Sequence, residues 1–124
     1  MLGNEARAAT SKLLLSPVSA ANTAAATSAW IDVRDSVGDI MFVNQVGALT
    51  GSLVWTIEHA SDDSGTGGAA ITPNEGAYAA VTANSIQKRT ISANACAGYV
   101  RCVGTIVTGP ALVAASVHTR PQIV

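Results

Sequence analysis

The stretch GYVRCVGTIVTGPALVAASV, residues 98–117, decides the fold, because it carries the strongest strand pattern in the chain. Apolar and β-branched residues dominate both of its halves. Between the halves, Thr108-Gly109-Pro110 has the composition of a turn. We therefore expect two strands, Gly98–Val107 and Leu112–Val117. They are neighbours in the sequence, so we expect them to pair as the firmest hairpin of the molecule.

Shorter segments of the same texture recur upstream at spacings of about ten residues. They span residues 30–33, 40–43, 53–58, 78–82 and 86–92. Connectors rich in Gly, Asp, Ser and Pro separate them, including Asn44–Gly51 and the loop Ser61–Gly68. About eight short strands without a convincing helix predict an all-β fold. We expect a small antiparallel β-sandwich, jelly-roll-like, with another sandwich or a small barrel as the alternatives.

The first 28 residues differ from the rest, being rich in Ala, Ser, Thr and Asn without an apolar stripe at helical spacing. Their candidate packing residues are Leu13, Leu14, Leu15 and Val18. Pro17 restricts a strand here to an edge or a bend. We expect residues 1–28 to form an extended arm with one short strand; the alternative is an ordinary first strand packed on its own subunit. A sandwich domain, 29–118, and a C-terminal tail, 119–124, follow.

Charge is scarce: 12% of residues are charged and 48% are hydrophobic, whereas soluble domains average about 25% charged residues. This deficit indicates a surface covered by other subunits, the alternative being an Ala-rich, weakly charged monomer. The seven basic and eight acidic residues are scattered, which argues against nucleic-acid binding. Apolar runs are too short to span a membrane. Met1–Ala9 has no hydrophobic signal core, so we expect synthesis in the cytoplasm.

The sequence contains no motif typical of a catalytic or cofactor-binding site, so we expect no enzyme and no cofactor. The glycines of the Ser61–Gly68 loop are followed by Ala and Ile and not by the Lys of a phosphate-binding loop. No nucleophile elbow is present. The imidazoles are those of His59, which we place at a strand end on the sandwich rim, and of His118, a candidate partner contact near the tail.

Two pairs of residues are candidate metal ligands, and neither pair indicates a metal site. Asp62 and Asp63 offer hard oxygen ligands for Ca²⁺, but their spacing is not that of an EF-hand and a turn accounts for them better. Cys96 and Cys102 are six residues apart in an extended segment, roughly 20 Å, which is too far for a disulfide. We expect both to be reduced, and no nearby His or third Cys completes a zinc site.

The two tryptophans are the candidate residues for sugar binding, because sugars stack on exposed aromatic rings. Trp55 shares its alternation with Leu53 and Ile57, which predicts a place in the core. Trp30 lies in a shorter strand and stays a candidate contact residue.

Several turn and strand patterns together resemble a known family. They are Trp30-Ile31-Asp32-Val33, Gly38-Asp39-Ile40, Val46-Gly47, Gly51-Ser52-Leu53, the run Ile57–Gly65, Gly98-Tyr99-Val100-Arg101 and Val107-Thr108-Gly109. Over about residues 29–117 the chain resembles the small β-sandwich decoration, or cement, proteins on the heads of tailed bacteriophages.

The resemblance implies a structural virion protein on the capsid exterior that bridges major capsid protein subunits, commonly as a homotrimer. Terminal arms in such proteins reach neighbouring subunits, which makes the arm leucines Leu13, Leu14 and Leu15, with Val18, the expected contacts, and Trp30 a further one. Alternatives are a head–tail connector, a tail subunit or a carbohydrate-binding module.

Overall fold

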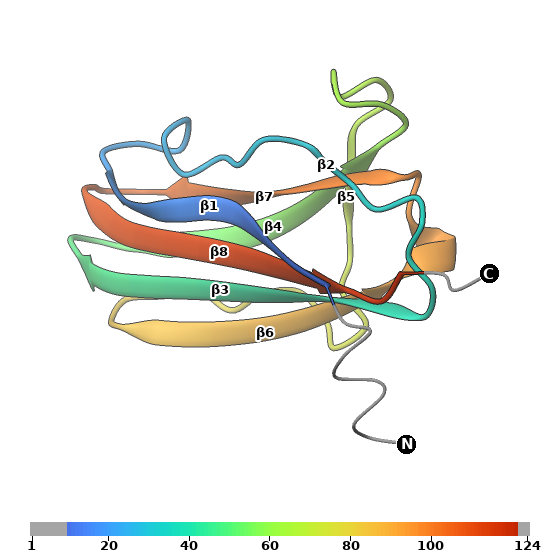
Figure 1. The fold of residues 1–124 in the computed structure, drawn as a ribbon. Coiled ribbons are helices and arrows are strands. Elements are labelled where there is room, and N and C mark those ends of the chain that lie inside the picture. The colour runs from blue at the N-terminus through green and yellow to red at the C-terminus, as the bar shows by residue number, and fades with distance from the viewer. Residues whose placement is uncertain (1–9, 122–124) are drawn as a thin grey trace.

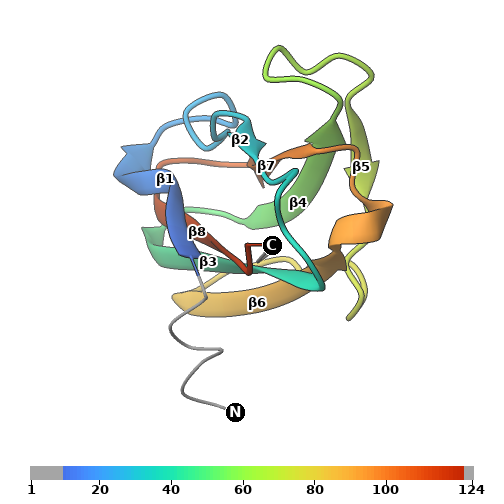
Figure 2. The same ribbon diagram turned by 45° about the vertical axis from the view of Figure 1, so that its right-hand side comes forward.

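The computed structural model describes residues 10–121 and contains two four-stranded antiparallel sheets packed face to face (Figures 1 and 2). Sheet I has the order β1 (Thr10–Ala20), β8 (Ala111–Thr119), β3 (Asp39–Leu49), β6 (Ser85–Ser92). Sheet II has the order β2 (Ile31–Asp32), β7 (Tyr99–Ile106), β4 (Leu53–Ala60), β5 (Ala69–Ile71). One turn of 3₁₀ helix, Ala93–Ala95, follows β6. The prediction of an all-β antiparallel sandwich is confirmed.

The chain crosses from one sheet to the other at every connection between these strands except β4 to β5. This strand order is that of a jelly roll. The predicted hairpin across Thr108-Gly109-Pro110 is wrong, because β7 belongs to sheet II and β8 to sheet I. Both strands carry a buried alternate face, with Val100 on β7 and Val117 on β8 fully buried. Placing them in opposite sheets turns both faces into the core.

The core lies between the sheets, where every second residue of the long strands is buried. Its largest buried side chains include Trp55, Phe42, Ile40 and Ile57. Trp55 is 2% exposed, so its predicted core position is confirmed. The expected connector at residues 44–51 is wrong over most of its length. β3 continues to Leu49, because the chain keeps alternating and places Asn44 inside.

In the core, the Tyr78 hydroxyl donates a hydrogen bond of 2.6 Å to Asn44 Oδ1, while Asn44 Nδ2 has no hydrogen-bond partner among the described residues. Residues 78–82, expected as a strand, form instead a loop that carries Tyr78 into the core. Within that loop only Val81 forms a β-bridge, with Leu53. Burial raises the pKa of Tyr78 far above its usual range.

The structure differs from the predicted arm over residues 10–28, and Met1–Ala9 lie outside the described residues. Thr10–Ala20 is β1, paired with β8 of the same chain, as in the alternative of an ordinary first strand. Leu14 is the reason, because it is 7% exposed and belongs to the core. Residues 23–28 then run along β7, where Ser28 N donates to Cys102 O at 3.0 Å.

Both cysteine thiols are free, with Cys102 buried and Cys96 half-buried. Burial raises the pKa of the Cys102 thiol to about 11, so it stays protonated as a small apolar core residue. Among residues 10–121, none of the helical structure is long and apolar enough to span a bilayer.

Candidate interaction surface

The outward side of sheet I is the surface that the core leaves exposed. On β8, Val113 and Val117 are buried, so their neighbours Leu112 and His118 point outward. Register extends this face across the sheet. The outer face of sheet I comprises Ser11 and Leu13 of β1, Leu112, Ala114, Ser116 and His118 of β8, Asp39, Met41, Val43, Gln45 and Gly47 of β3, and Ile86, Lys88, Thr90 and Ser92 of β6.

This face combines exposed apolar side chains with polar ones and carries few charged groups. Among the described residues, its acidic and basic side chains are Asp39, at the start of β3, Lys88 on the edge strand and His118 on β8. Its exposed fractions are high for large hydrophobic residues: Leu13 58%, Ile86 62% and Leu112 48%. Contiguous exposed apolar patches of this kind mark interaction sites in soluble proteins.

A shallow groove of about 340 Å³ crosses the face over β1, β8 and β3. Its lining is Pro17, Val18, Ser19, Gln45, Gly47, Leu112, Val113 and Ala114. Gly47 leaves space for it, since a Cβ there would lie 3.2 Å from the Cβ of Leu112. The groove is therefore a consequence of a missing side chain on the central strand β3.

At the opposite end of the face, His118 lies between two hydroxyl groups. Its Nδ1 is 2.8 Å from Ser11 Oγ, and its Nε2 is 3.0 Å from Ser116 Oγ. Both ring nitrogens thus have a serine as hydrogen-bond partner, and neither has the carboxylate that orients a catalytic histidine. The arrangement adds hydrogen-bonded polar groups to the face.

The predicted contact residues divide between the core and the surface. Leu14 is in the core and Leu15 packs against it. Leu13 lies on the outer face, and Val18, 40% exposed, lines the groove. Sequence reasoning missed Leu112, although its alternation with Val113 within the predicted strand was the available signal.

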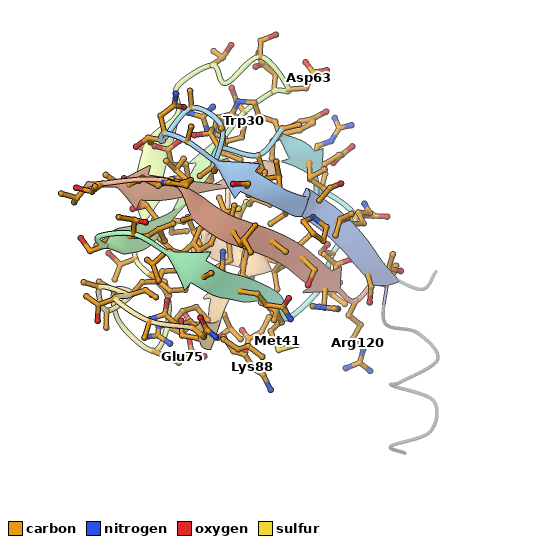
Figure 3. All side chains as sticks on the ribbon, turned by 90° about the vertical axis from the view of Figure 1, so that its left-hand side faces the viewer. Trp30, Met41, Asp63, Glu75, Lys88 and Arg120 are labelled. Atoms are coloured by element: carbon orange, nitrogen blue, oxygen red, sulfur yellow. The ribbon has the colours of Figure 1, made fainter. Side chains whose placement is uncertain are left out.

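Trp30 lies on the other side of the sandwich from Met41 and Lys88 (Figure 3). The Arg101 guanidinium stacks 4.5 Å from its ring centroid, and Arg101 Nε forms an ion pair of 2.7 Å with Glu58. The loop between β4 and β5 covers the indole from another side, with Gly65 against its Nε1. Trp30 is thus occupied by its own chain.

The acidic pair of that loop forms a turn. Asp62 Oδ1 accepts hydrogen bonds of 3.0 Å from the main-chain N–H groups of Ser64 and Thr66. Hydrogen bonds from the side chain and the main chain of Thr66 lower the pKa of Asp62 most strongly, and the main-chain bond from Ser64 lowers it further. No group of three or more potential metal-ligating His, Cys, Asp or Glu side chains occurs within residues 10–121.

The fold and the surface define this chain as an eight-stranded jelly-roll sandwich with one exposed apolar face. The sequence matches no protein-family model and no curated protein sequence. Solved structures similar to it include the VP2 protein of infectious bursal disease virus in its subviral particle, with 13% identity over 90% of this chain and a TM-score of 0.45. Others are the derived T=1 particles of that virus (16%, 91%, 0.43) and its T13 particle (15%, 91%, 0.40). In each comparison the match covers 32% of the viral chain.

Proposed function

We propose that this chain is a structural virion protein that binds the outer surface of a bacteriophage capsid and stabilises the shell by bridging major capsid protein subunits. The observation that carries the proposal is the outer face of sheet I, which exposes the large apolar side chains of Leu13, Ile86 and Leu112 and carries few charged groups. The proposed activity is binding without catalysis.

The size of the face favours repeated weak contacts over one tight contact. Four strands spaced about 4.8 Å apart, each contributing about eight residues at about 3.3 Å per residue, cover an area of roughly 500 Å². A stable interface between two proteins buries about 800 Å² on each partner. A face below that size becomes effective when many copies are held on one particle, where each contact reinforces the next.

The fold is compatible with this function and with one alternative, since jelly rolls occur in both viral capsid and lectin domains. A lectin-type site needs an accessible aromatic ring, but Trp55 is buried and Trp30 is stacked with Arg101. Capsid binding is therefore the better supported of the two. The phage head as the location, the trimeric state and the major capsid protein as the partner rest on the resemblance of residues 29–117 to decoration proteins.

The proposal is tested by locating the protein on particles of the virus that encodes it. A labelled copy is imaged by electron microscopy, and its copy number per particle is measured. We expect label distributed over the head in many copies. Label at the neck or along the tail would assign the protein to a connector or tail, and particles without label would overturn a virion role.

A further inference from the structure

The two edges of sheet I differ in what satisfies their main chain. At the β6 edge, Thr90 N donates to Glu75 Oε1 at 2.7 Å, and Asn74 N donates to Thr90 O at 2.8 Å. The loop that carries Glu75 and Asn74 thereby satisfies the outward main-chain groups of Thr90. Among residues 10–121, no strand or loop pairs with the outward edge of β1.

The main-chain direction of each residue follows from the β6 edge, since successive residues of a strand point their N–H and C=O groups to opposite sides. Thr90 points away from β3, so Arg89 points toward it and pairs with Phe42. Phe42 then faces β6, and its neighbour Met41 faces β8. Met41 pairs with His118, so the main chain of His118 is directed at β3.

Continuing across the sheet identifies the open groups on β1. Because His118 faces β3, Val117 faces β1, where its partner is Lys12. Lys12 therefore bonds to β8, and its neighbours Ser11 and Leu13 point their N–H and C=O groups off the edge of the sheet. The register is continuous over these residues, with its first shift after Leu13.

A hydrogen bond at the C-terminal end gives an independent check. Val37, just before β3, donates from its main-chain N–H to Arg120 O at 2.8 Å. Arg120 is two residues beyond His118, so the two residues share a direction along an extended chain. Both point toward β3, in agreement with the assignment through β6.

We propose that the edge at Ser11 and Leu13 accepts an extended segment of the capsid subunit, which adds a fifth strand to sheet I. The inference rests on the proposed function and reverses the expected role of this run: it receives a strand instead of reaching out as an arm. Strand addition takes its affinity from main-chain hydrogen bonds and its specificity from alternate side chains. The exposed Leu13 side chain offers an apolar contact beside the added strand.

Charge argues against a second copy of this chain as the occupant. An antiparallel self-pair that uses both open residues sets Ser11 against Leu13 of the other copy, which places Lys12 opposite Lys12. Like charges directly opposite each other destabilise a strand pair. The segment that fits carries a neutral or acidic residue opposite Lys12. It is short, because the register shift after Leu13 and Pro17 disrupt the edge further along.

The test uses the variant Ser11→Pro, added to heads that lack the protein. Proline is tolerated on an edge strand where the N–H faces solvent, so the free protein should fold, but the edge loses a donor. We expect its affinity for heads to fall at least tenfold. The matched control Ser11→Ala also loses the hydroxyl contact with His118 but keeps the N–H, and it should bind like wild type. Equal binding of the two variants would overturn the edge proposal and leave the proposed function intact.

Amide hydrogen exchange by NMR supplies a measurement that needs no variant. In the free protein, Ser11 and Leu13 amides should exchange faster than those of Thr10 and Lys12, and on heads the fast pair should become protected. Protection already present in dilute free protein would overturn the proposal, because the edge would be occupied. Protection that grows with protein concentration would assign the edge to a second copy and overturn the capsid partner. Wild-type protein that fails to bind heads would refute the proposed function and this inference with it.

Discussion

The two outer faces of the sandwich arise from the same alternation of side chains along the strands, but they differ in how far the chain itself covers them. On sheet II, Arg101 binds Glu58 and stacks on Trp30. The loop between β4 and β5 protrudes from the sandwich (Figure 1), and its Gly65 and Gly68 lie against the indole. On sheet I, Leu112 and Ile86 stand exposed without cover from residues 10–121. The polar groups of sheet II are satisfied by their own chain, whereas the outer face of sheet I leaves large apolar side chains exposed.

The same division holds for the edges of sheet I, of which the β6 edge is capped through Glu75 and the β1 edge is open at Ser11 and Leu13. Open face and open edge adjoin at Leu13. The open edge therefore lies beside the His118 end of the outer face, and the groove lined by Leu112 lies toward the other end of the same face.

The largest predicted effect comes from placing a charge on the open face. Leu112→Asp puts a carboxylate in the groove, where a bound partner would bury it unpaired. We expect binding to heads to weaken at least thirtyfold, about 2 kcal/mol. Because Leu112 is 48% exposed, its loss should lower the free energy of unfolding by less than about 1 kcal/mol. Sedimentation with heads and urea denaturation measure the two effects.

The matched control is Val107→Asp, which places the same charge on a residue that is 74% exposed but lies in the β7–β8 connection, off the face. It should bind heads like wild type. If both variants bind equally well, the outer face of sheet I is not the docking face.

On the covered face we predict a loss of stability and not of binding. Arg101→Ala removes both the ion pair with Glu58 and the stacking on Trp30, whose geometries are 2.7 Å and 4.5 Å. We expect the free energy of unfolding to fall by about 1–2 kcal/mol, measured by urea denaturation. Affinity for heads should stay within twofold of wild type. A tenfold loss of affinity at unchanged stability would mean that sheet II is the docking face.

A smaller effect on stability is expected from alanine substitutions in the loop between β4 and β5. Two of its glycines distinguish the contact of the loop with Trp30 from the cost of backbone strain. Gly65 and Gly67 both have positive φ, +85° and +67°, but a Cβ at Gly65 would lie 3.0 Å from Trp30 Nε1, while one at Gly67 meets open space. Gly67→Ala therefore reports the backbone cost, about 1 kcal/mol. Gly65→Ala should cost more, and it should change the fluorescence of Trp30 in a Trp55→Phe background. Equal costs would show that the loop does not hold the indole.

Local patterns predicted the strands better than their partners. Alternation at Leu53, Trp55 and Ile57 was sufficient to place Trp55 in the core. It could not place β7 and β8 in opposite sheets, because a turn such as Thr108-Gly109-Pro110 serves a hairpin and a crossing between sheets equally well. The topology depends on contacts distant in sequence, such as the pairing of β1 with β8.

The candidate surface was predictable only in part, for a related reason. The leucines of β1 signalled apolar contact, but the bulge after Leu13 decides which of them turn inward, and no local rule gives its position. Asn44 looked like the start of a connector because its partner, Tyr78, is 34 residues away. Leu112 was visible as an exposed residue only once Val113 was known to face the core.

The smallest predicted effect concerns the carboxylate of Asp32 on β2, which is paired with Arg34 of the same chain. The Arg34 side chain donates two hydrogen bonds to Asp32, and together with the bond from the Arg34 main chain they lower the pKa of Asp32 to about 2. An unfolded Asp titrates near 3.9. The pair's contribution to stability is therefore fully present above about pH 4 and is lost as the pH falls through about 2. Because both side chains are well exposed, 64% and 45%, that contribution is small. Arg34→Ala should raise the Asp32 pKa toward 3.9 in an NMR titration, while the pKa of Asp62, held by its own turn, stays low. If Asp32 in the wild-type protein titrates near 4, Arg34 does not stabilise its carboxylate, and the charges at this edge of sheet II are not paired within the chain.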